Sequence, residues 1–113
     1  MTPPLSFARL VAIWNGDLGI DELDQLVTAT YRGHIGSRSR DLAQLKLDIA
    51  AYRENAPGVR FTPEHQFGQG VYLATRLTAH AGGRTITGLN MSRWQDDLLA
   101  EEWAVWESFP DSV

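Results

Sequence analysis

The 113-residue sequence contains no cysteine, which excludes disulfide bonds and thiolate metal sites and favours a reducing, cytoplasmic location. It has no basic cluster and a net charge of −4, which argues against nucleic acid as a partner. No apolar run approaches the roughly 20 residues that span a bilayer. The first ten residues also lack the cationic start and apolar run of a signal peptide. We therefore expect neither a nucleic-acid nor a membrane partner.

Signatures of cofactor and metal chemistry are missing as well. There is no nucleophile elbow, phosphate loop or dinucleotide-binding motif, and Gly68-Gln69-Gly70 is typical of a turn between strands. His65 and His80 are far apart and lack companion carboxylates, so we expect no metal site. The sequence predicts a protein that works without a metal or a cofactor.

The residues that are present predict one globular domain over positions 1–113. Hydrophobic residues make up 43% of the chain and four are tryptophans, a composition that can build a core. In the first half, positions of helical spacing are apolar: Phe7, Leu10, Val11 and Trp14. We predict a second helix from Ile20 to about Thr28, and a third from an N-cap near Ser39 to Asn55. The glycine-rich stretch between them, 30–37, predicts an irregular or extended crossing.

The second half changes to the alternating pattern of strands, in four runs near 59–67, 71–80, 84–94 and 98–107. The last two runs flank a turn at Gln95-Asp96-Asp97, and each face of the final run carries a tryptophan, so we expect both faces of the sheet to be covered. Helices followed by antiparallel strands predict an α+β fold with the helices on one face of a curved sheet.

Four markers then appear in order: Trp14-Asn15-Gly16-Asp17, Tyr31-Arg32-Gly33-His34, Pro57, and Glu101-Glu102-Trp103-Ala104-Val105-Trp106-Glu107. Over nearly the whole chain they resemble the SnoaL-like polyketide cyclase branch of the nuclear transport factor two-like (ketosteroid isomerase-like) superfamily. The resemblance implies a cone: three N-terminal helices on a strongly curved antiparallel sheet of about four strands, with a pocket at the open end. It also implies a homodimer formed through the outer face of the sheet.

Two arguments disagree about which strand residues face the pocket. Hydrophobicity alone turns one set to the core: Val71, Leu73, Leu77, Leu89, Met91 and Val105. The resemblance implies the opposite set: Tyr72, Ala74, Arg76, Thr78, Ile86, Gly88, Asn90, Glu102, Ala104 and Trp106. We adopt the second set because small-molecule pockets combine apolar walls with a few polar groups. The predicted ligand-binding residues are therefore Trp14, Tyr31, Tyr72, Thr78, Ile86, Gly88, Ala104 and Trp106.

Two of the predicted catalytic residues, His34 and Arg76, follow from the resemblance. It places His34 at the border of the pocket, where an imidazole can move a proton near neutral pH; the alternative is a histidine bonded to the loop backbone. Arg76 falls where the epoxide-hydrolase branch has an arginine between two aspartates, but those positions here are Thr78 and Ala104. Ala104 also stands where SnoaL-like cyclases commonly carry their acid/base aspartate.

Glu102 and Asn90 complete the predicted catalytic set. Glu102 lies two residues before Ala104, on the same strand face, and can replace the missing carboxylate or pair with Arg76 at the pocket floor. Asn90 can donate a hydrogen bond to an enolate or carbonyl oxygen, or can be a buried amide bonded within the sheet.

These residues predict binding of a small, largely apolar, carbonyl-bearing molecule, with cofactor-free proton transfer for cyclisation or isomerisation as the enzymatic version. The alternative is a non-catalytic ligand-binding or dimerisation protein of the same fold, and a third option is a hydrolase with water activated by Glu102. Unpaired His34 and Glu102 converging on one void would favour catalysis, whereas a pocket whose polar groups are already paired would favour binding.

Overall fold

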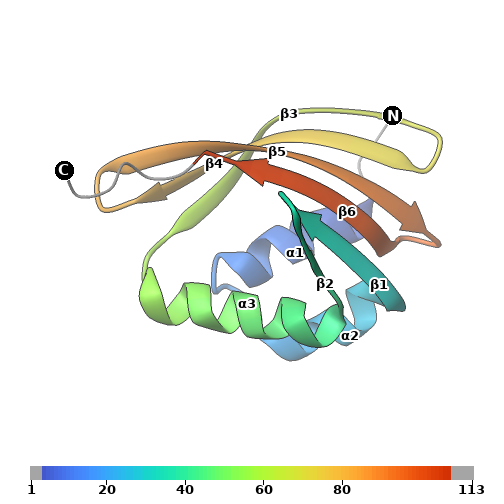
Figure 1. The fold of residues 1–113 in the computed structure, drawn as a ribbon, viewed down its shortest axis with the longest axis horizontal. Helices are drawn as coiled ribbons and strands as arrows, with labels where there is room; N and C mark the ends of the chain where they lie inside the picture. Colours follow the sequence, from blue (N-terminus) through green and yellow to red (C-terminus); the bar gives the residue numbers. More distant parts are fainter. Residues whose placement is uncertain (1–3, 108–113) are drawn as a thin grey trace.

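The computed structural model describes residues 4–107, in which helices cover one face of a single curved sheet (Figure 1). The helical elements are α1 (Leu5–Trp14), the short 3-10 helix η1 (Ile20–Glu22), α2 (Leu23–Leu26) and α3 (Leu42–Asn55). The strands are β1 (Val27–Ile35), β2 (Arg38–Arg40), β3 (Arg60–Gln69), β4 (Tyr72–Ala81), β5 (Arg84–Gln95) and β6 (Leu98–Trp106). The predicted α+β class, with helices on one face of a curved sheet, is confirmed. No helix among residues 4–107 is long and apolar enough to cross a membrane.

The strands follow the spatial order β2-β1-β6-β5-β4-β3. Neighbours along β3 to β6 are antiparallel, as predicted, whereas β1 runs parallel to β6 and antiparallel to β2. The turn between β5 and β6 contains Asp96 and Asp97 with φ of 53° and 64°, a left-handed conformation that aspartate tolerates better than most residues. Asp97 also accepts a hydrogen bond from Ser6 Oγ at 3.0 Å, which ties the start of α1 to this hairpin.

The sheet has six strands rather than the four expected, because the segment between the second and third helices is extended. The second helix ends at Leu26, and the third begins at Leu42 after Asp41, whose side chain accepts the Gln44 backbone N–H at 2.8 Å. Ser39, the N-cap expected from the sequence, lies in β2. Pairing with β6, which is more than 60 residues away in sequence, stabilises β1 as a strand, and local patterns do not reveal such a contact.

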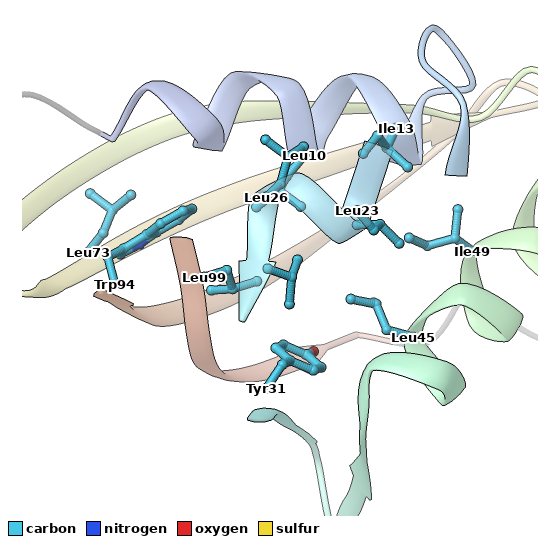
Figure 2. Packing of buried hydrophobic residues seen from close by; sticks show 11 residues of the cluster. Leu10, Ile13, Leu23, Leu26, Tyr31, Leu45, Ile49, Leu73, Trp94 and Leu99 are labelled. Atoms are coloured by element: carbon cyan, nitrogen blue, oxygen red, sulfur yellow. The ribbon is translucent and has the colours of Figure 1, made fainter. Parts of the chain in front are cut away.

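Two clusters of buried side chains join the helices to the sheet. Figure 2 shows the first, in which Leu10 and Ile13 of α1 meet Leu23 and Leu26 of α2 and residues of α3 and the sheet. The second is built around Phe61 and Ile86, and packs against the partly buried rings of Trp14, Tyr52 and Trp106.

Strand register divides the sheet residues between an inner face, toward the helices, and an outer face. On β5 and β6, the set of alternate residues that faces inward is the one implied by the family resemblance. It consists of Ile86, Gly88, Asn90, Ser92, Glu102, Ala104 and Trp106. On β4, the set that faces inward is instead the one that hydrophobicity alone predicted. It consists of Leu73, Thr75, Leu77 and Ala79. Tyr72, Ala74, Arg76 and Thr78 are therefore on the outer face, and their expected place in the pocket is wrong. Pairing of β4 with β5 sets this phase, because Leu77 lies opposite Gly88 and Arg76 lies opposite Leu89.

Candidate functional site

A cavity of about 430 Å³ lies between the helices and the inner face of the sheet. Residues of both core clusters form much of its wall, among them Leu10, Trp14, Phe61, Trp94 and Trp106. The volume falls within the roughly 300–1,000 Å³ typical of small-molecule sites, which also combine apolar walls with a few polar groups. The polar residues that line this cavity are Arg38, Arg40, Asp48, Asn90, Ser92 and Glu102.

Glu102 is the centre of a hydrogen-bond network in this wall. Its Oε1 accepts a hydrogen bond from Asn90 Nδ2 at 2.9 Å. Its Oε2 accepts from Arg40 Nη2 at 3.2 Å and from the Tyr31 hydroxyl. The side chain of Glu102 is only 12% exposed, so these three donors replace water around a largely buried carboxylate.

Arg40 links this network to α3, and the sequence analysis missed it. Its side chain is 6% exposed, and it donates from Nε to the Tyr31 hydroxyl at 3.1 Å and from Nη1 to Asp48 Oδ2 at 3.1 Å. The guanidinium carbon also lies 5.7 Å from the centre of the Trp14 ring, within cation–π range. In the sequence, Arg38-Ser39-Arg40-Asp41 resembles a solvated polar stretch, so only the strand pairing reveals that Arg40 is buried.

Two glycines make room for the large side chains at the site. A Cβ atom on Gly33 would collide with the Tyr31 hydroxyl and would lie 3.0 Å from both Cγ and Nε of Arg40. A Cβ atom on Gly88 would collide with the indole of Trp106. The glycine in the Tyr31-Arg32-Gly33-His34 marker therefore allows Tyr31 and Arg40 to meet above β1.

Burial and charge set the protonation of the network. Burial raises the pKa of Tyr31, and the neighbouring charge of Glu102 raises it further, so the hydroxyl remains a hydrogen-bond donor at neutral pH. Burial opposes the charge of Arg40, but Glu102 and Tyr31 hold the pKa of its guanidinium above the usual value. Burial also acts to raise the pKa of Asp48, but hydrogen bonds from Gln44 and Arg40 keep it below its usual range.

The structure separates the four residues predicted to be catalytic. Asn90 and Glu102 line the inner cavity and bond to each other. His34 and Arg76 instead line a second cavity, of about 550 Å³, together with outer-face residues such as Met91 and Val105, and Asn90 and Ala104 border this second cavity as well. There, His34 Nε2 lies 2.8 Å from Glu101 Oε2, and its ring stacks on Trp103. His34 and Glu102 therefore do not converge on one void, and the alternative Arg76–Glu102 pair is excluded because these side chains occupy opposite faces.

The residues predicted to bind a ligand also divide between several places. Trp14, Ala104 and Trp106 line the inner cavity, and Tyr31 lies behind Glu102 as its donor. Ile86 packs in the second core cluster, and Gly88 lies beneath Trp106. Tyr72 and Thr78 are on the outer face, where Thr78 donates to Glu64 at 2.9 Å. Within residues 4–107, no group of three or more histidine, aspartate or glutamate side chains is placed to hold a metal ion.

No protein-family model and no curated protein matches the sequence. Solved structures do match: wild-type IdmH, a candidate polyketide cyclase from Streptomyces antibioticus, has a TM-score of 0.79 and 21% identity over 95% of this chain and 93% of that one. A loop-truncation variant of IdmH has a TM-score of 0.82 and 22% identity over 94% and 93%. A candidate SnoaL-like polyketide cyclase from a Jannaschia species has a TM-score of 0.80 and 13% identity over 95% and 90%. The chain therefore has the cone-shaped fold of the SnoaL-like polyketide cyclases, as its sequence markers predicted.

Proposed function

We propose that this protein binds a compact, largely apolar, carbonyl-bearing molecule in the inner cavity. The observation that carries the proposal is a cavity of about 430 Å³ whose aromatic and aliphatic walls surround a few polar groups, Asn90 and Glu102 among them. Burial of an apolar ligand against these walls provides affinity, and the polar groups orient it. The candidate polyketide cyclases named above have the same fold, which supports a ligand of this class.

Binding accounts for the site better than proton transfer does. Both oxygens of Glu102 already accept hydrogen bonds, from Asn90, Arg40 and Tyr31, so a proton-transfer role would compete with these donors. His34 is on the other face of the sheet, bonded to Glu101, and Ala104 offers no carboxylate at the usual acid/base position. We therefore place the binding function first and assign Glu102 to holding Asn90, Tyr31 and Arg40 in position.

Prodan, a fluorescent naphthyl ketone, is a suitable probe of the cavity because its emission shifts to the blue in apolar surroundings. We expect saturable binding to the wild-type protein. Ala104→Phe should fill the cavity and weaken binding by about tenfold or more, the equivalent of about 1.4 kcal/mol. Fluorescence titration measures both affinities.

Ala50→Phe is the matched control, because Ala50 is exposed on α3 and lines neither cavity. Its prodan affinity should equal that of the wild type, and thermal unfolding should show that both variants are folded. Failure of the wild type to bind prodan, or equal binding by Ala104→Phe, would contradict the proposed site.

We also propose that two copies of the chain pair through the outer face of the sheet. This face and its β3–β4 edge carry apolar side chains that are 42–76% exposed: Phe67, Tyr72, Leu89, Met91 and Val105. An apolar surface of this kind is unfavourable in water and is typical of an interface. The exposed apolar side chains of this face therefore support the homodimer expected from the sequence.

Sedimentation velocity tests the pairing. The wild type should sediment as a dimer at micromolar concentration, and Leu89→Lys should shift it to monomer, because a lysine opposite the partner's apolar surface loses its hydration. Leu47→Lys, at an exposed leucine of α3, should remain dimeric. A wild-type monomer, or dissociation by the Leu47 variant alone, would contradict pairing through this face.

A further inference from the structure

The orientation of the Asn90 amide follows from its partner. Glu102 Oε1 lies 2.9 Å from the amide, while Arg40 and Tyr31 donate to the other oxygen of the same carboxylate. A carboxylate only accepts hydrogen bonds, so Asn90 must turn its Nδ2 toward Glu102. Its carbonyl oxygen Oδ1 is then directed away from Glu102, on the side chain that lines the inner cavity.

Asn90 Oδ1 accepts no hydrogen bond from any residue between 4 and 107. The other polar groups on the inner face nearby are already paired: Ser92 Oγ donates to the Leu73 carbonyl at 3.3 Å and accepts from Trp94 Nε1 at 2.8 Å. An apolar ligand that covered Oδ1 would remove water from an acceptor without replacing its hydrogen bond. Among apolar ligands that bind this cavity, one that also offers a donor at this position should therefore bind more tightly than one that does not.

Ala104 provides the space beside this acceptor. It lies directly opposite Asn90 in the pairing of β5 with β6, and both side chains line the cavity. A larger side chain at position 104 would occupy the volume next to the amide, whereas the single methyl group of alanine leaves it open. The small side chain of Ala104 thus gives a ligand group access to Asn90.

We propose that Asn90 is the specificity-determining residue of the cavity, and that its Oδ1 selects ligands with a phenol or enol hydroxyl on their flat apolar body. This inference rests on the proposed function, since it concerns the same cavity. From the sequence, Asn90 was expected to donate a hydrogen bond to a ligand oxygen. In the structure its amide group donates to Glu102, so the group that it offers to a ligand is the acceptor Oδ1. The ligand would donate its hydroxyl hydrogen to Oδ1 with no covalent step.

The test compares β-naphthol with β-naphthyl methyl ether, which share an aromatic body and differ in the donor. The wild type should bind β-naphthol about tenfold more tightly, the ratio expected for one buried hydrogen bond. Asn90→Leu should reduce this ratio to near one. Gln66→Leu, which removes an amide that lines neither cavity, should keep it.

Equal binding of the two compounds by the wild type would overturn the inference and leave the proposed function standing, whereas binding of neither would contradict the proposed function itself. A preference retained by Asn90→Leu would also overturn it. Should that variant not fold, the side-chain amide resonances of Asn90 in the wild type provide the readout. They should shift more with β-naphthol than with the ether, and equal shifts would overturn the inference.

Discussion

Replacement of Arg40 by methionine should destabilise the protein by about 3–5 kcal/mol, the range for breaking a buried ion pair by removing one partner. Arg40 is 6% exposed and bonds Glu102, Asp48 and Tyr31, which lie on β6, α3 and β1. Methionine fills similar space but leaves the carboxylate of Glu102 without its cation. Urea unfolding at neutral pH measures the loss.

Two further variants test whether the loss of stability comes from breaking the buried ion pair or would follow the removal of any arginine. Arg60 forms an exposed pair with Asp17, so Arg60→Met should have little effect on stability. Glu102→Gln added to Arg40→Met should recover part of the loss, because it removes the carboxylate that was left unpaired. An Arg40→Met protein as stable as Arg60→Met would show that the network does not stabilise the fold.

Substitution of Gly33 by alanine should cost about 1–3 kcal/mol, as expected when an atom is added to a closely packed site. The new methyl group would meet the Tyr31 hydroxyl and lie 3.0 Å from Arg40 Nε, so Tyr31 or Arg40 must move from its hydrogen-bonding position. The same substitution at Gly19 is the control, because a Cβ atom there meets nothing within 4 Å and its φ is −70°. Urea unfolding of the two variants gives the comparison.

The Tyr31→Phe variant tests whether contact with the Tyr31 hydroxyl causes the loss of stability in Gly33→Ala. It removes the oxygen that the alanine would meet, so Gly33→Ala should cost less in the Tyr31→Phe background than in the wild type. Part of the cost should remain, because Arg40 is still close. Equal costs in both backgrounds would rule out the hydroxyl contact as the reason for glycine at this position.

Local patterns were sufficient for the elements that depend on neighbours in sequence. The apolar spacing of Phe7, Leu10, Val11 and Trp14 predicted α1, and the polar cluster at Gln95-Asp96-Asp97 predicted the turn between β5 and β6. The order of helices and strands, together with the four markers, predicted the cone-shaped fold. Asn90, Glu102, Ala104 and Trp106 were also placed on the correct face of the sheet.

The predictions that failed concern which face of the sheet a side chain occupies. They failed where pairing between distant segments sets the face, or where a shift of one residue along a strand reverses it. Side chains alternate between faces, so the incorrect phase for β4 moved Tyr72, Arg76 and Thr78 to the wrong side together. His34 was expected beside the pocket because of its place in a marker, but pairing of β1 with β6 puts it across from Trp103 on the outer face.

The sequence by itself determined the presence of three helical segments, the hairpins from β3 to β6 and the class of fold, because periodicity and turn residues act over a few neighbouring positions. The tertiary structure decided which side chains share the cavity. Burial of Arg40 and its bonds to Tyr31 and Glu102 depend on β1 lying parallel to β6. That pairing brings together residues about 70 positions apart, and no local pattern encodes it.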